Sequence, residues 1–135
     1  MRRQTIQTPI TVSGKGLHTG TASSVCLRPK VNNAPGWTIN QIPLQECHVL
    51  SSRLATKICV ADHTVSTTEH LFAALVGLGI TDIHIETTDH EIPILDGSSK
   101  LWFDRLTPIS LDSEVKPLRI TQKLNINNGT VQLSM

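Results

Sequence analysis

The hydrophobic residues of this 135-residue chain follow a helical period most clearly over residues 66–79. The positions on the apolar face of this segment are Leu71, Ala74, Leu75 and Leu78. Ser66 and Glu69 have the spacing of a capping box, which predicts that the helix begins at Ser66. Gly77 and Gly79 predict its end, because glycine adopts the left-handed conformation of a helix C-cap without steric cost.

Alternation of apolar and polar residues predicts strands on both sides of this helix. Residues 80–87 alternate cleanly, with Ile83 and Ile85 on one face, which indicates a half-buried strand. Further strands are expected at Thr5–Val12, Thr21–Leu27, Trp37–Ile39 and Leu54–Val60.

The segment after residue 90 predicts a loop and a second helix. Pro93 and Gly97 interrupt residues 91–98, so an ordered loop is expected there. A short helix should follow, capped by residue 96 or 98 and ending near residue 106. The predicted fold class is α+β, a mainly antiparallel sheet with two helices packed on one face.

The C-terminal part of the chain predicts a hairpin after a linker. Residues 108–117 are expected to be a linker, and an Asn-Gly turn joins predicted strands Leu118–Ile126 and Val131–Leu133. A single hairpin is marginal without a sheet to join. We therefore expect residues 1–107 to form one domain and residues 118–135 to begin a truncated second domain.

Charge and cysteine content narrow the classes of function. The net charge is +1 and no basic run exceeds Arg2-Arg3, which argues against a nucleic-acid partner. No stretch of 18 apolar residues exists, so no membrane span is predicted. Cys26, Cys47 and Cys59 are odd in number and form no C-x-x-C pair, which favours buried or half-buried free thiols in the cytoplasm over disulfides or a cysteine zinc site.

Glu69 and His70 are the first candidates for chemistry. Adjacent helical residues project about 100° apart, so a reacting group between their tips can meet both. The structural alternative is that Glu69 only caps the helix and His70 is solvated. His18 follows a Gly-x-Gly turn and is either a site residue or a hydrogen-bonded turn residue.

Two other sequence features argue for ordinary roles. None of the six histidines has a ligand-type residue four positions later, so the helical H-E-x-x-H zinc arrangement is absent. The acidic run Glu86, Asp89 and Glu91 is expected to be a solvated edge.

Four motifs occur together in one order. They are Gly-Lys-Gly-Leu-His-Thr-Gly at residues 14–20, Thr-Thr-Glu-His-Leu-Phe-Ala-Ala-Leu at 67–75, Gly-Leu-Gly-Ile-Thr-Asp at 77–82, and Glu-Ile-Pro-Ile-Leu-Asp-Gly-Ser at 91–98. From about Thr5 to Leu106 the chain closely resembles the N-terminal half of UDP-3-O-acyl-N-acetylglucosamine deacetylase. That family is a group of zinc hydrolases that commit material to lipid A synthesis in Gram-negative bacteria. The hairpin from Leu118 is similar to the opening of the family's second domain.

The resemblance implies a function and roles for individual residues. His70 would be a zinc ligand, Glu69 the general base, and His18 a residue near the active site or substrate. The loop at residues 96–98 would be chiefly architectural. The implied fold is two similar α+β domains with the active site between them, the implied cofactor is Zn²⁺, and the implied partners are UDP-3-O-acyl-N-acetylglucosamine and a second domain in cis or in trans.

The chain also departs from the family pattern. Thr68 replaces a usually apolar residue, and Asp82 stands where Asn is common. The family's other two zinc ligands, in a His-Lys-x-x-Asp motif, and its general acid are not found in this sequence. Because a catalytic zinc needs about three protein ligands, we expect the 135 residues to be inactive alone. The alternative is a stand-alone, non-catalytic interaction domain derived from the enzyme.

Overall fold

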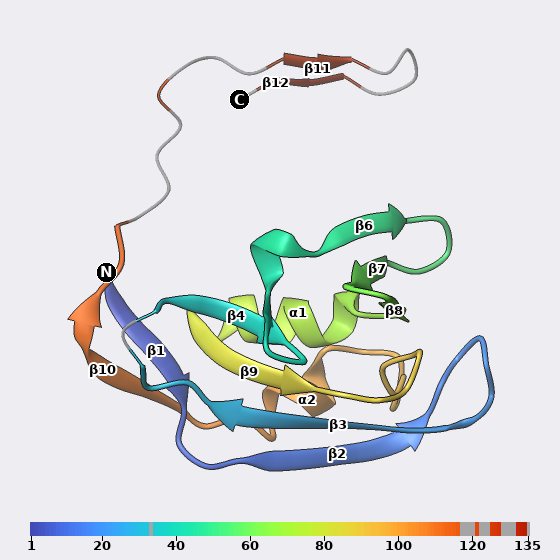
Figure 1. Ribbon diagram of the computed structural model, residues 1–135, viewed down its shortest axis with the longest axis horizontal. Helices are drawn as coiled ribbons and strands as arrows, with labels where there is room; N and C mark the ends of the chain where they lie inside the picture. Colours follow the sequence, from blue (N-terminus) through green and yellow to red (C-terminus); the bar gives the residue numbers. More distant parts are fainter. Residues whose placement is uncertain (33, 117–120, 122–124, 128–131, 135) are drawn as a thin grey trace.

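The computed structural model describes residues 1–32, 34–116, 121, 125–127 and 132–134, with side chains up to residue 125. Two α-helices and mostly antiparallel strands make up this part of the chain (Figure 1). The predicted α+β class is confirmed, although the strands form several small sheets instead of one.

A five-stranded sheet forms the centre of the fold, in the order β2-β3-β9-β4-β5. Its strands are β2 (Ile10–Lys15), β3 (Ala22–Pro29), β9 (Asp82–Glu86), β4 (Gly36–Ile39) and β5 (Ile42–Pro43). The neighbours pair antiparallel except for β4 and β9, which are parallel. Long strands β2 and β3 form a hairpin that extends past the rest of the sheet (Figure 1).

Smaller sheets lie beside the central one. They contain β1 (Arg2–Ile6) with β10 (Pro108–Glu114), and β6 (His48–Ser51) with β7 (Lys57–Val60) and β8 (His63–Val65), and a 3₁₀ turn at Leu44–Glu46 precedes β6. β10 lies within the segment predicted as a linker, and it pairs antiparallel with the first strand of the chain. Most of residues 108–117 therefore belong to the two-stranded sheet with β1, because the backbone N–H and C=O groups of β10 need hydrogen-bond partners and β1 supplies them.

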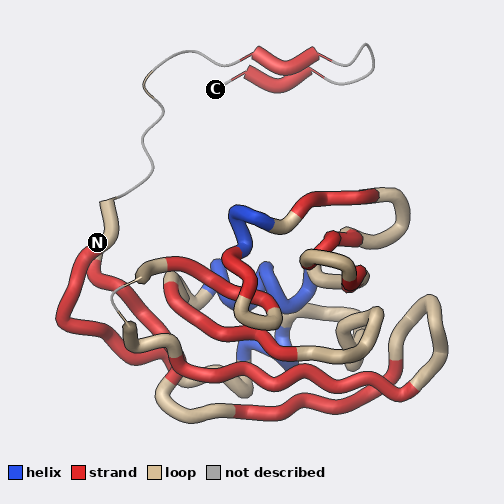
Figure 2. The backbone as a smooth tube through the Cα atoms, viewed as in Figure 1, coloured by secondary structure: helices blue, strands red, loops and turns tan. Residues whose placement is uncertain are grey.

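Helices α1 (Glu69–Gly77) and α2 (Lys100–Phe103) pack on the same side of the central sheet (Figure 2). The predicted apolar face of α1 is confirmed at Leu71, Ala74 and Leu75, which are buried, whereas Leu78 is the C-cap and only partly buried. The rest of the core comes from the sheets, from Trp102 of α2 and from the connecting segments; its buried members include Ile6, Val25, Leu27, Ile58, Val65, Ile83, Ile85, Trp102 and Leu106.

The predicted start of α1 is wrong, and its predicted end is confirmed. The first helical residue is Glu69, preceded by Thr68 as the N-cap without a side-chain capping bond. Ser66 instead forms a parallel bridge with Glu91, and its hydroxyl donates to the carbonyl oxygen of His90, so it lies outside the helix and its side chain does not cap it. At the other end Gly79 has φ +69° and its amide bonds to the carbonyl of Val76, as expected for a glycine that ends a helix.

The remaining predictions from the sequence have mixed outcomes. Residues 91–98 form a loop, as predicted, and α2 is shorter than expected. β11 (Asn125–Asn127) and β12 (Gln132–Ser134) pair antiparallel, which confirms a hairpin there, while its predicted turn lies outside the described residues. The three cysteines are free and half-buried. Among the described residues, no helix is both long and apolar enough to cross a membrane.

Candidate functional site

Glu69 and His70 are the first two residues of α1, and their side chains approach each other. Oε1 of Glu69 lies 4.0 Å from Nε2 of His70, with the side chains 36% and 26% exposed. The other carboxylate oxygen, Oε2, accepts a hydrogen bond of 2.9 Å from the backbone N–H of Thr56. The carboxylate is therefore oriented by the segment before β7, with one oxygen on the His70 side and with access to solvent.

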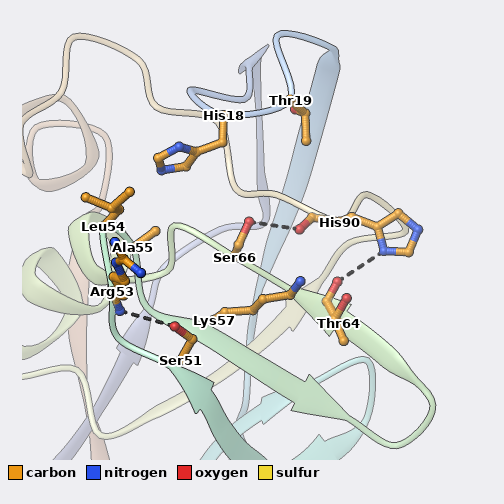
Figure 3. A pocket seen from close by; sticks show the side chains of 10 residues that line it. All are labelled: His18, Thr19, Ser51, Arg53, Leu54, Ala55, Lys57, Thr64, Ser66 and His90. Carbon is orange, nitrogen blue, oxygen red and sulfur yellow. Dashed lines mark hydrogen bonds between the residues drawn. The ribbon is translucent and has the colours of Figure 1, made fainter.

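Thr56 connects α1 to a pocket of about 340 Å³. The pocket is lined by His18, Thr19, Ser51, Arg53, Leu54, Ala55, Lys57, Thr64, Ser66 and His90 (Figure 3). Thr56, which follows the lining residue Ala55, also accepts bonds from Thr68 at its carbonyl oxygen. Glu69 and His70 are not among these lining residues. Glu69 is linked to the pocket through its hydrogen bond with Thr56, which lies between the lining residues Ala55 and Lys57.

The pocket carries positive charge and one exposed apolar side chain. Arg53 and Lys57 contribute cationic groups, and Lys57 extends along the pocket from the side of Ser51 toward Thr64 (Figure 3). Leu54 is 84% exposed and has a left-handed backbone, φ +66°. A concave surface with these groups suits a ligand that combines anionic and apolar parts.

His18 lies in the tight loop that joins β2 to β3, and its ring is drawn above Leu54 in Figure 3. The loop is closed by backbone bonds from the Gly16 amide to Thr21 and from the Gly20 amide to Gly16, each 3.0 Å. His18 is exposed, and its backbone N–H is held by a carboxylate of another segment. The structure thus brings the predicted His18 loop and the segment before α1 together in the lining of one pocket.

That carboxylate belongs to Glu91, and the prediction that Glu91 is solvated is wrong. Glu91 is 1% exposed, and its oxygens accept bonds from the amides of His18 (3.0 Å) and Thr19 (2.9 Å) and from the hydroxyl of Thr67 (2.8 Å). Burial alone raises the pKa of this carboxyl, but bonds from the backbone of His18 and Thr19 and from the hydroxyls of Thr19 and Thr67 outweigh it and lower the pKa to about 2.

Comparison with known proteins assigns the chain to a family. A sequence model of the family UDP-3-O-acyl N-acetylglycosamine deacetylase matches residues 3–135. The chain belongs to this deacetylase family. Several curated proteins named UDP-3-O-acyl-N-acetylglucosamine deacetylase are also similar to it over most of its length.

Three of these deacetylases illustrate the extent of the match. The one from Lawsonia intracellularis is 37% identical over 92% of this chain and 42% of its own length. The one from Synechocystis is 34% identical over 89% of this chain and 48% of its own length. The one from Geobacter strain M21 is 40% identical over 72% of this chain and 34% of its own length. The chain therefore spans between a third and a half of these relatives.

The residues described here do not complete a zinc site of the kind the deacetylase resemblance implies. They contain no group of three or more His, Cys, Asp or Glu side chains that could hold a metal ion. A catalytic zinc takes about three protein ligands. The half-exposed imidazole of His70 fits the role of one such ligand, and the rest of the set would have to come from elsewhere.

Asp82, one of the departures from the deacetylase family pattern, has a structural role in this chain. It is fully buried and pairs with Arg3, whose Nη2 lies 2.6 Å from Oδ1 and whose Nε donates to Oδ2 at 3.0 Å. The Gly36 amide also donates to Oδ1. Burial raises the pKa of Asp82, but the hydrogen bonds from Arg3, Thr81 and Gly36 lower it overall. The Asp82 carboxylate neutralises the charge of the buried Arg3 guanidinium, which the uncharged side chain of an asparagine at this position would leave unpaired.

Proposed function

We propose that this chain supplies one half of a zinc-dependent deacetylase active site, which hydrolyses the N-acetyl amide of UDP-3-O-acyl-N-acetylglucosamine. The observation that carries the proposal is the Glu69–His70 pair, solvent-accessible at the first turn of α1 in a chain of this family. In the proposed assignment His70 is one zinc ligand, and two further ligands and a general acid come from a second domain in cis or in trans. When bound, zinc would supply a Lewis acid that lowers the pKa of water from about 15.7 toward 7.

Glu69 is proposed as the general base. Its Oε2 is fixed by the Thr56 amide, so the carboxylate is held in one orientation with Oε1 toward His70. A carboxylate held in this way can accept the proton of an attacking water as it adds to the amide carbonyl, and general-base catalysis contributes roughly 10² to 10⁴ in rate.

His18 and the pocket beside it are proposed to bind substrate. The pocket combines the cations Arg53 and Lys57 with the exposed Leu54, and it opens beside the segment that orients Glu69. A nucleotide-linked acyl sugar combines anionic phosphates with an apolar chain, and the cationic and apolar side chains of this pocket are complementary to these two parts.

Complementation tests the proposed function. The 135-residue chain is mixed with the part of the Lawsonia intracellularis deacetylase that it does not cover, and acetate release from UDP-3-O-acyl-N-acetylglucosamine is measured. We expect activity from the mixture and none from either part alone. Absence of activity with both parts folded and bound to each other would contradict the proposal and favour a non-catalytic interaction domain.

Variants of the pair separate the two roles. We expect Glu69→Gln to lower kcat of the mixture by about 10²- to 10⁴-fold with zinc content unchanged. His70→Ala should lower zinc content itself, measured by atomic absorption. His48→Ala is the matched control, since His48 is an exposed histidine on β6 outside the pocket. Equal zinc content in His70→Ala and His48→Ala would refute the ligand assignment.

A further inference from the structure

Glu91 is a buried residue that joins two segments of the pocket lining, the one at Ser66 and the loop that carries His18. Its backbone lies beside Ser66: the amide of Ser66 bonds to the carbonyl of His90 at 2.9 Å, and the amide of Ile92 bonds to the carbonyl of Ser66 at 3.0 Å. Its side chain reaches the other segment, where it accepts hydrogen bonds from the backbone amides of His18 and Thr19. One residue therefore contacts both segments, which lie about 50 residues apart in the sequence.

The donors to this carboxylate are all neutral. Two are consecutive amides of the His18 loop, and the others are the hydroxyls of Thr19 and Thr67. No Lys, Arg or His side chain pairs with Glu91 among the described residues. The stability of a buried carboxylate held only by neutral donors depends on the positions of those donors, because each missing hydrogen bond leaves part of the negative charge unsatisfied in a low-dielectric environment. The loop and the carboxylate thus fix each other.

Thr67 shows that the same carboxylate also restrains the chain leading into α1. Thr67 is 1% exposed and has φ +59°, a left-handed conformation that is an outlier for a β-branched residue. Such strain persists only where the surroundings determine the conformation. The bond from its Oγ1 to Oε1 of Glu91, 2.8 Å long, is a restraint of this kind, and it lies two residues before Glu69.

The backbone of Gly16 lies against the Glu91 carboxylate with no room for a side chain. A Cβ placed on Gly16 would lie 2.2 Å from Oε2 of Glu91 and 2.3 Å from Oγ1 of Thr19. The loop backbone is therefore packed directly onto the Glu91 carboxylate, which only a residue without a side chain allows at this position.

We propose that Glu91 is a positioning residue: its buried carboxylate holds the loop that carries His18 against the segment that begins α1, and so sets His18 relative to Glu69 and His70. The geometric part of this proposal stands on the contacts of this chain alone. Its consequence for turnover rests on the proposed function.

The test uses the isotopically labelled 135-residue chain with Glu91→Gln, which keeps the shape of the side chain and removes its charge. Glu86→Gln is the matched control, because Glu86 is an exposed carboxylate, paired with Arg28. Amide hydrogen exchange is measured at His18 and Thr19, together with the ring carbon–proton signals of His18 and His70. In Glu91→Gln we expect exchange at these two amides to become about 10- to 100-fold faster, the range for losing a hydrogen bond to a charged group, and both ring signals to move.

The same measurements distinguish positioning from stability alone. A purely structural role would accelerate exchange of the buried β3 amides to the same extent and leave the ring signals of the folded protein unchanged, and this result overturns the proposal. If Glu91→Gln does not fold, Thr67→Gly replaces it, since glycine accepts the left-handed backbone while losing the hydroxyl. That variant should move the His70 signal and leave the His18 amide protected; an unmoved His70 signal overturns the proposal.

The complemented enzyme tests the consequence for turnover. With wild-type mixture active, Glu91→Gln should lower kcat at least about 10-fold with zinc content unchanged, whereas Glu86→Gln should not. An unchanged kcat overturns the proposal. If the wild-type mixture is inactive, the proposed function fails, and the exchange and ring measurements still decide whether Glu91 positions the loop.

Discussion

The hydrogen bonds to the buried Glu91 carboxylate predict a specific dependence of stability on pH. A carboxyl whose pKa falls from 4.5 to about 2 on folding stabilises the folded state at neutral pH. At 1.36 kcal/mol per pKa unit this contribution is about 3 kcal/mol. Because the folded-state pKa is the lower one, the contribution is complete above the unfolded pKa and is lost as the pH falls from about 4.5 toward 2.

The variant Glu91→Gln isolates this contribution, since glutamine does not ionise. The free energy of unfolding should be about 3 kcal/mol lower in the variant at pH 7, and the difference should shrink to about 2 kcal/mol at pH 3.5. Other acidic groups such as Asp82 titrate in both proteins and cancel in the difference. Urea unfolding followed by tryptophan fluorescence measures it, because Trp102 is 0% exposed in the folded protein.

Two results would refute this reasoning. A difference that stays constant between pH 3.5 and 7 would mean that folding does not lower the pKa of the Glu91 carboxyl, and a difference that grows as the pH falls would mean that folding raises this pKa. Glu86→Gln is the control for an ordinary, exposed carboxylate. Because the ion pair of Glu86 with Arg28 is exposed, the free energy of unfolding at pH 7 should fall by less than about 1 kcal/mol in this variant.

Other substitutions test the remaining buried contacts by the same urea unfolding. Arg3→Met should destabilise the fold by about 3–5 kcal/mol, because it leaves the buried Asp82 charge unpaired, and adding Asp82→Leu should recover most of that loss. Gly16→Ala should cost about 1–3 kcal/mol, because its Cβ would lie 2.2 Å from Oε2 of Glu91. Gly77→Ala should change stability by less than about 1 kcal/mol, and favourably, since the nearest atom to its Cβ would be 3.8 Å away. Equal losses at the two glycines would contradict the steric argument.

Local periodicity predicted the elements that form the core. The helical spacing of Leu71 and Leu75 and the alternation of Ile83 and Ile85 identified the buried faces of α1 and β9, because a single element determines each pattern. The division into several sheets and the pairing of β10 with β1 depend on contacts between distant parts of the chain, and no local pattern reveals them.

The candidate site was predictable only in part for the same reason. The resemblance to the deacetylase family pointed to His18, Glu69 and His70, but Glu91 was placed on a solvated edge. The amides that bind Glu91 lie more than 70 residues away, and nothing in an acidic run reveals such partners. The one local signal was the apolar, proline-containing segment that follows Glu91, which indicated that its neighbours are buried.

The failed capping-box prediction has a physical consequence for Glu69. In a capping box this carboxylate would turn back to bond the amide at the helix start. Here the helix begins three residues after Ser66, the Ser66 hydroxyl donates to the carbonyl oxygen of His90, and Oε2 of Glu69 accepts instead from the Thr56 amide. This partner holds the carboxylate outward with Oε1 beside His70. The proposed base therefore has one carboxylate oxygen bound by a backbone amide of a distant segment and the other beside His70, an arrangement that an ordinary capping box would not give.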